Sequence, residues 1–324
     1  MGEHAIIELM RKHFTPMPGV VVPFGDDVSA VPLRPGDVAV LKTDMLVAQT
    51  DVPKGMSLWQ AARKAVVMNV SDFAAKGVVP QAALVSLGLP ENLKFTDLED
   101  LAQGLDAGAR EYGAYVVGGD TGEACDLMVA VSLFGVSAHK GLMLRSGTQA
   151  GDVLAVTGLF GKPAAGLRLL QGGYPASSEL REALAKAVCM PMARLREGLA
   201  LRDSGAVTAS IDSSDGLAWC LHELAAQSGV GFLVSALPVA EETAKFAEQN
   251  GLDASESALY GGEEYELVVT VDPKRWAEAE KAVEDAGGRL LPIGKATRNP
   301  RVLLDDPGGK RVIEARGYEH FKGK

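Results

Sequence analysis

Residues Tyr115–Thr121 read YVVGGDT, a short apolar run that is followed by two glycines and a carboxylate. The run predicts a β-strand that ends at the glycines, because Gly-Gly-Asp is a common way to leave a strand. Two other apolar runs end in the same manner, Val38–Asp44 (VAVLKTD) and Val207–Asp215 (VTASIDSSD). The repetition predicts that carboxylates from separate strands gather at one site.

Two more segments add side chains of the same kind. Gly25-Asp26-Asp27 is a loop pair, and Asn69–Asp72 (NVSD) places an amide and a carboxylate on one face if the segment is helical. Carboxylates held close together repel each other unless cations lie between them. Mg²⁺ commonly binds through a few carboxylates together with substrate phosphates. The sequence therefore predicts a magnesium site that handles phosphate groups.

A simpler interpretation exists for any single Asp, which is a turn residue or a helix cap. Asp37 and Asp152 are of that kind, since each follows a glycine in a turn signal. The simpler interpretation would need six coincidences to account for the whole set, which comprises Asp27, Asp44, Asp72, Asp120, Asp212 and Asp215.

Composition limits the class of protein. The chain has 324 residues with 47% hydrophobic residues, which is enough for one large or two ordinary domains. The net charge is −10 and there is no Lys/Arg block, so a nucleic-acid surface is not expected. The three cysteines and five histidines are scattered, which argues against disulfides and zinc. With no signal-peptide pattern and no apolar run of membrane-spanning length, we expect a soluble, cytoplasmic protein.

Strand and helix patterns alternate along the chain, so the expected fold class is α/β or α+β. Ser57 is a good N-cap for a long helix that stops at Gly77. Asp72 would lie near the C-terminal end of that helix, where the macrodipole disfavours an anion, and this favours a bound cation. We expect a strand to end at Thr43-Asp44, Asp51 to lie in a loop, and the last core strand to be Arg289–Ile293.

Common nucleotide motifs are missing from the sequence. Gly158–Lys162 (GLFGK) lacks the spacing of a Walker A loop, and Pro163 follows the lysine where Ser or Thr is required. No dinucleotide fingerprint, protein-kinase signature or nucleophile elbow occurs. The aspartates are therefore the candidates for the chemistry.

Eight segments carry a resemblance that spans nearly the whole chain. They are Gly25–Asp27 (GDD), Thr43–Val47 (TDMLV), Asn69–Gly77 (NVSDFAAKG), Gly118–Thr121 (GGDT), Arg145-Ser146-Gly147 (RSG), Ile211–Leu217 (IDSSDGL), Gly261–Leu267 (GGEEYEL) and Gly317–Phe321 (GYEHF). With these segments the chain resembles the thiamine-monophosphate kinases, in the superfamily that includes aminoimidazole ribonucleotide synthetase.

The resemblance implies a two-domain fold like that of aminoimidazole ribonucleotide synthetase, with residues 1–138 as an N-terminal ATP- and Mg-binding domain. Residues 139–324 would form a C-terminal α/β domain that completes the site. It implies a homodimer in which the N-terminal sheets join into a barrel. It also implies Mg-dependent, in-line transfer of the ATP γ-phosphoryl to thiamine monophosphate in thiamine biosynthesis, with several Mg²⁺ ions and no catalytic side chain.

Site residues follow from the same resemblance. The metal set would be Asp27, Thr43, Asp44, Asp72, Asp120, Asp212 and Asp215. The ATP-binding set would be Gly119, Asp120, Arg145, Ser214 and Tyr112. The substrate-binding set would be Asp51, Glu263 and Tyr318, since an aromatic ring and carboxylates suit a cationic thiazolium.

Three residues depart from the family pattern, and two other functions stay open. Lys42 stands where many members have Ser, Asp51 where many have His, and Glu264 where Asp is usual. One alternative is a sister ATP-dependent enzyme such as aminoimidazole ribonucleotide synthetase, against which GGEEYEL and GYEHF argue. The other is a non-catalytic nucleotide- or metal-binding regulator, against which the complete aspartate set argues.

Overall fold

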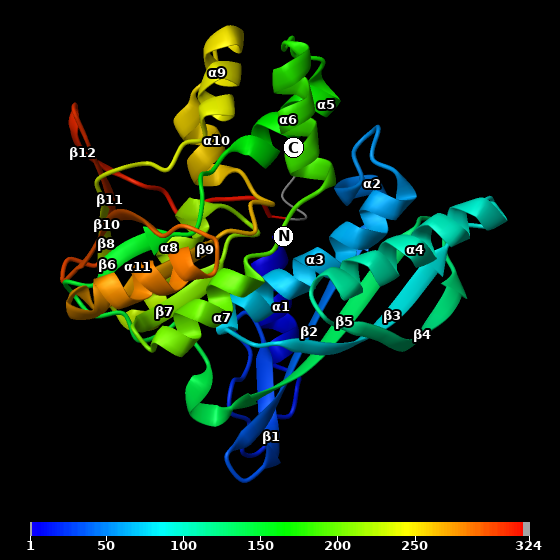
Figure 1. Ribbon diagram of the computed structural model, residues 1–324, viewed down its shortest axis with the longest axis horizontal. Helices are drawn as coiled ribbons and strands as arrows, with labels where there is room; N and C mark the ends of the chain where they lie inside the picture. Colours follow the sequence, from blue (N-terminus) through cyan, green and yellow to red (C-terminus); the bar gives the residue numbers. More distant parts are fainter. Residues whose placement is uncertain (1, 320–324) are drawn as a thin grey trace.

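The first half of the chain folds around a five-stranded sheet in the computed structural model, which describes residues 2–319 (Figure 1). The strand order is β1-β2-β5-β3-β4, and only the β3–β4 pair is parallel. Helices α3 and α4 cover one face of this sheet. The strands are β1 (Ser29–Arg34), β2 (Asp37–Val47), β3 (Pro80–Leu89), β4 (Tyr115–Glu123) and β5 (Met128–Ala138). The helices are α1 (Glu3–Arg11), α2 (Ala48–Asp51), α3 (Leu58–Lys76) and α4 (Phe95–Glu111).

The second half folds around a seven-stranded sheet of order β12-β11-β8-β10-β6-β9-β7, in which only the β8–β11 pair is parallel. Its strands are β6 (Val153–Val156), β7 (Val207–Asp212), β8 (Gly231–Val234), β9 (Leu267–Val271), β10 (Leu291–Thr297), β11 (Val302–Asp306) and β12 (Gly309–Val312). Its helices are α5 (Lys162–Gly172), α6 (Ser178–Cys189), α7 (Leu195–Ser204), α8 (Leu217–Ser228), α9 (Glu241–Asn250), α10 (Ala254–Tyr260) and α11 (Trp276–Asp285). Two short 3-10 turns, η1 (His139–Gly141) and η2 (Pro273–Arg275), complete the list.

Helix α3 is the element that joins the two halves. Ser57 and Gln60 form a capping box at its start, and Gly77 ends it with a φ of 64°, so both predicted ends are confirmed. One side of α3 packs on β2, β5 and α4, while another packs on α7 and β7 of the second half. Gly198 of α7 permits this close approach, because a Cβ there would lie 2.1 Å from the Ala74 carbonyl oxygen.

The prediction that strands end at their carboxylates was wrong for two of them. Strand β2 runs on through Asp44 to Val47, and β4 runs on through Gly118 to Glu123. Both strands continue because a neighbouring strand supplies backbone partners along the whole length, β5 for β2 and β3 for β4. Local turn propensity is overridden by this pairing.

Several other predictions needed correction. Asp51 is the last residue of the short helix α2 rather than part of a loop. The strand predicted at Arg289–Ile293 begins at Leu291, and β11 and β12 follow it. Among the described residues, no helix has the length and apolarity that crossing a membrane requires. His320 and Phe321 of the GYEHF segment lie outside the described residues.

Candidate active site

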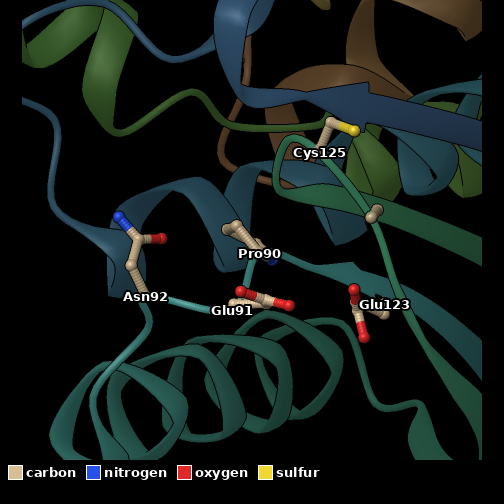
Figure 2. A pocket seen from close by; sticks show the side chains of 6 residues that line it. Pro90, Glu91, Asn92, Glu123 and Cys125 are labelled. Atoms are coloured by element: carbon tan, nitrogen blue, oxygen red, sulfur yellow. The ribbon is translucent and has the colours of Figure 1, made fainter.

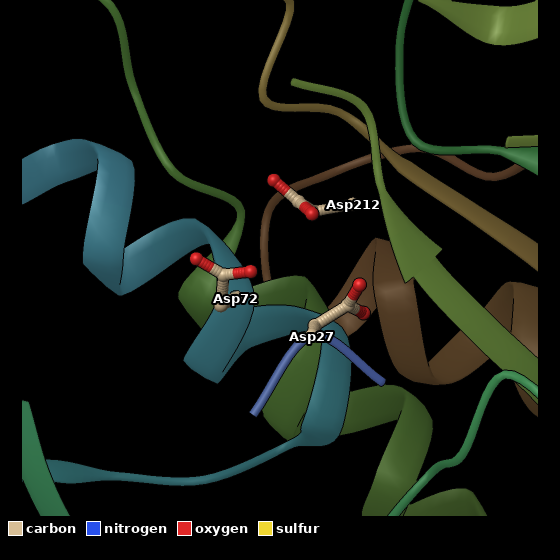
Figure 3. Close-up of side chains that lie close together, drawn as sticks. All are labelled: Asp27, Asp72 and Asp212. Carbon is tan, nitrogen blue, oxygen red and sulfur yellow. The ribbon is translucent and has the colours of Figure 1, made fainter. Parts of the chain in front are cut away.

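Three carboxylates meet where the two halves of the chain touch. Asp27 comes from the loop before β1, Asp72 from the last turns of α3, and Asp212 from the end of β7 (Figure 3). One oxygen of each lies within 4.8 Å of the others, and all three residues are buried. The sequence predicted all three as members of one set.

Local contacts hold these carboxylates in place. Ser71 Oγ of α3 donates a hydrogen bond of 2.8 Å to Asp212 Oδ2, which ties the two halves together. Asn69, three residues before Asp72 on α3, accepts a 2.9 Å hydrogen bond from the Asp44 backbone N–H through its Oδ1 atom. The helical spacing expected for Asn69 and Asp72 is thus confirmed, and it brings β2 against the site.

Three basic side chains lie among the acids. Lys42 Nζ is 3.1 Å from Asp44 Oδ1 and 3.1 Å from Asp72 Oδ1. The fully buried Lys76 Nζ is 2.6 Å from Asp26 Oδ1 and 2.8 Å from Asp27 Oδ2. Arg145 Nε donates to Asp27 Oδ1 at 2.7 Å. The Lys42 ammonium thus lies beside Asp72, and the bound cation predicted there stays a prediction.

The acids differ in their proton affinity for physical reasons. Burial, followed by repulsion from Asp27, raises the pKa of Asp212 to about 7. Burial likewise raises the pKa of Asp72 well above its ordinary value, although Lys42 opposes this. Burial alone would raise the pKa of Asp27, but Arg145 and Lys76 outweigh it and lower that pKa. In Asp72 and Asp212, burial thus disfavours the charged form more than the neighbouring cations favour it.

The donor set fits Mg²⁺. Three buried carboxylates that converge within 4.8 Å offer hard oxygen ligands, and burial raises the pKa values of Asp72 and Asp212, so a bound cation would stabilise their charged forms. Ser71 holds the Asp212 carboxylate, and Asn69 holds the Asp44 backbone beside this set.

The rest of the predicted metal set is divided by the first sheet. Thr43 alternates with Asp44 along β2, so their side chains point to opposite faces. Asp120 is exposed on the edge strand β4, three strands from β2 and roughly 14 Å away at about 4.8 Å per strand. The residue in register with Asp120 on β2 is Met45, whose side chain is exposed, so Asp120 lies on the same exposed face of the sheet. Within one chain, Thr43 and Asp120 do not reach the buried cluster through their side chains.

The predicted ATP-binding residues occupy three places. Arg145 is at the cluster, and Ser214 lies just past Asp212, where its carbonyl accepts a 2.7 Å hydrogen bond from the Glu263 N–H. Gly119 is on the exposed edge strand beside Asp120. Tyr112 follows α4, and its hydroxyl oxygen accepts a 2.9 Å hydrogen bond from the Ala193 N–H. Burial raises the pKa of Tyr112 to about 12.

The predicted substrate residues form a second group near the cluster. Lys64 of α3 donates to the Asp51 carbonyl at 3.1 Å and lies 2.5 Å from Glu263 Oε1. Burial, then the charges of Asp51 and Glu263, raise the pKa of Tyr318. The Tyr318 N–H donates to the Asp215 carbonyl at 3.0 Å, which links this group to the turn after Asp212.

Backbone strain marks the same group. Glu263 and Tyr265 have φ values of 66° and 55°, in a region that residues other than glycine rarely adopt. The segment is fixed by hydrogen bonds from the Glu263 N–H to Ser214 and from the Tyr265 N–H to Ser213. The remaining Glu263 oxygen, Oε2, is buried and has no hydrogen-bond partner among the described residues. Strain of this kind concentrates at ligand sites.

Sequence reasoning missed the buried lysines. A lysine in the last turn of a helix is usually solvated and interacts favourably with the helix dipole, so nothing in the sequence singled out Lys76. Lys64 lies within an apolar helical run and is 1% exposed. The available signal was the position of Lys64 and Lys76 on one helix with Asp72, since buried lysines require acidic partners.

A surface hollow lies elsewhere. It has a volume of about 440 Å³ and is formed by the turn after β3 and the link from β4 to β5 (Figure 2). Its polar lining includes Glu91, Glu123 and Cys125. None of the predicted site residues lines it, and carboxylates without a cation would repel a phosphate. We therefore assign the chemistry to the buried cluster.

The comparison with known families fits this architecture. The model of the AIR synthase related protein N-terminal domain matches residues 25–137, and that of the C-terminal domain matches residues 149–305. The chain therefore belongs to the AIR synthase related proteins.

Curated relatives narrow the assignment. The thiamine-monophosphate kinase of Nitrosopumilus maritimus is 35% identical over 297 residues, which are 92% of this chain and 93% of that protein. The thiamine-monophosphate kinase of Pyrococcus horikoshii is 36% identical over 302 residues, covering 92% and 91% of the two chains. Within the AIR synthase related proteins, the chain belongs to the thiamine-monophosphate kinase family.

A solved structure agrees over nearly the whole length. AaThiL complexed with AMPPCP and TMP superposes with a TM-score of 0.86 at 29% identity, covering 99% of this chain and 97% of that one. The two-domain α/β fold expected from the sequence is thereby confirmed.

Proposed function

We propose that this protein transfers the γ-phosphoryl group of ATP to the phosphate of thiamine monophosphate, giving thiamine diphosphate and ADP. The observation that carries the proposal is the convergence of Asp27, Asp72 and Asp212 between the halves of a chain from this kinase family. AaThiL was solved in complex with AMPPCP and TMP, which match an ATP analogue and this acceptor.

The acceptor explains why no catalytic base is needed. A phosphate monoester is already ionised at neutral pH, so it attacks without losing a proton, and transfer needs mainly positioning and charge neutralisation. Mg²⁺, when bound, would supply that neutralisation. Asp27, Asp44, Asp72 and Asp212 would hold the ions. Arg145, fixed against Asp27, would place its guanidinium on a phosphate.

The strained segment provides a receptor for thiamine. Glu263 Oε2 is free to accept a hydrogen bond from the aminopyrimidine, since Lys64 holds the other oxygen. The Tyr318 ring, which is 49% exposed, and the Asp51 carboxylate suit the cationic thiazolium. Asp215 follows Asp212 by three residues, and its carbonyl accepts a hydrogen bond from the Tyr318 N–H, which connects this receptor to the acidic cluster.

A homodimer is part of the proposal. The face of the first sheet that α3 and α4 leave uncovered carries exposed apolar side chains, which include Leu41 at 44%, Met45 at 53% and Leu84 at 53%. Every residue of the edge strand β4 is exposed. A second copy would cover this face and edge. Thr43, Gly119 and Asp120 lie there, so they would serve a site to which both copies contribute.

The domain division at residues 138 and 139 is also a proposal. It is supported by the two family models, of which one ends at residue 137 and the other begins at residue 149.

Formation of thiamine diphosphate from ATP, Mg²⁺ and thiamine monophosphate tests the function directly. Turnover should stop after exhaustive chelation and return when Mg²⁺ is added. ATP hydrolysis or binding without any thiamine diphosphate would favour the sister enzyme or the regulator. Full turnover in the chelated enzyme would disprove the metal-dependent mechanism.

A further inference from the structure

The Lys42 ammonium occupies a position that a metal ion would otherwise take. Its Nζ atom lies 3.1 Å from one oxygen of Asp44 and 3.1 Å from one oxygen of Asp72, with only 20% of the side chain exposed. Mg²⁺ between the same two oxygens would sit about 2.0–2.1 Å from each. The ammonium and a divalent ion cannot both fill this space.

A charge count shows what remains for metal. Six carboxylates surround the site when all are counted as ionised, and three cationic side chains contact them, which leaves a formal charge of −3. The carboxylates are Asp26, Asp27, Asp44, Asp72, Asp212 and Glu223, and the cations are Lys42, Lys76 and Arg145. One divalent ion reduces this charge to −1, whereas a second would leave the buried site positive before any phosphate arrives.

Lys42 is the cation that decides the count. Lys76 is held from two sides, since it also donates to the Ser210 carbonyl at 2.8 Å, and Arg145 is placed to meet a phosphate. Lys42 lies between Asp44 of β2 and Asp72 of α3, and both of these acids belong to the proposed metal set. Its charge substitutes for the charge of an ion at that pair.

We propose that Lys42 is a built-in cation that replaces one divalent ion between Asp44 and Asp72, so that the nucleotide-free protein binds about one ion tightly at this cluster. Further ions would then enter with the phosphates of ATP. The inference rests on the proposed function, because it concerns the same site.

The test counts metal directly. Mn²⁺ is titrated into the nucleotide-free protein, and the free ion is measured by electron paramagnetic resonance to give the number bound per chain. We expect about one tight ion in the natural protein, and about one more in Lys42→Met, which lacks the charge and offers no ligand. Lys42→Arg should keep the natural count, and the exposed Lys140→Met is the matched control.

Equal counts in the natural protein and Lys42→Met would overturn the proposal, because the ammonium would then move aside for an ion. Two or more tight ions in the natural protein would overturn it as well, and this measurement holds even if Lys42→Met fails to fold. The count does not depend on turnover. Failure to form thiamine diphosphate with a natural count of one would refute the function and leave the role of Lys42 standing.

Discussion

The raised pKa values of single carboxyl groups at this site determine how the stability of the folded protein changes with pH. Asp212 has a pKa of about 7 in the folded protein because burial and Asp27 disfavour its charge, against an ordinary value of 3.8. Between these values the folded protein holds a proton that the unfolded chain has lost. Its stability must therefore fall as pH rises through this window. Asp72, whose pKa is also raised, acts in the same direction.

The chelated protein should accordingly melt at a lower temperature at pH 8 than at pH 5. Asp212→Asn should reduce this slope, because the uncharged amide no longer titrates. Added Mg²⁺ should raise the melting temperature most at pH 8, where the carboxylates are ionised. Thermal unfolding followed by circular dichroism checks all three. A natural protein that melts equally at both pH values would contradict the prediction.

Asp51 shows how one residue can combine a structural and a binding role. Its Oδ2 atom accepts a 2.7 Å hydrogen bond from the N–H of Val47, the residue before α2, and so ties the last residue of this short helix to its start. Asp51→Ala would disturb both roles, whereas Asp51→Asn keeps an oxygen for Val47 and loses only the charge.

Asp51→Asn should raise the KM for thiamine monophosphate by roughly tenfold, which is the effect of losing a charge-assisted contact of about 1.5–3 kcal/mol. The KM for ATP and the Mg²⁺ requirement should barely change. Steady-state kinetics with each substrate varied in turn gives these values. A variant that needs much more Mg²⁺ and binds thiamine monophosphate normally would place Asp51 with the metal ligands.

At the scale of elements, the contact between α3 and α4 depends on a small residue. A Cβ added at Gly104 of α4 would lie 2.2 Å from the Trp59 carbonyl oxygen of α3, which is backbone and cannot move aside alone. Gly104→Ala should therefore lower the free energy of unfolding by about 1–3 kcal/mol, even though alanine favours the helix. Denaturant titration measures the change. Gln103→Ala, at an exposed position on the same helix, should have little effect.

The elements also show where sequence was sufficient. Helix α3 was predicted to its ends because Ser57 and Gly77 are local signals that act within a few residues. The ends of β2 and β4 were not, since a strand stops where its neighbour stops pairing, and that neighbour is distant in the chain. The same distinction applies to the site. Asp27, Asp72 and Asp212 were found together by motif, but the face on which Asp120 lies depends on sheet register.

At the scale of the whole molecule, the proposed dimer can be tested through its apolar face. Val117 of β4 is 64% exposed, and Val312 of β12 is 57% exposed on the edge strand of the other sheet. Val117→Glu should convert the dimer to a monomer, because a charge would be buried at the joined edge. Val312→Glu should leave the dimer intact. Sedimentation equilibrium distinguishes these outcomes, and a natural protein that sediments as a monomer would refute the dimer.

Helix α3 makes the folding of each half of the chain depend on the other half. Fifteen of its nineteen residues are buried, and the side that meets α7 and β7 includes Lys76, whose hydrogen bond to Ser210 crosses to the second sheet. Cutting the chain between the halves would open this side to water and leave Lys76 without that partner. We therefore expect that neither half folds alone. Residues 1–138, expressed separately or joined to another protein by genetic shuffling, should aggregate unless the other half is supplied.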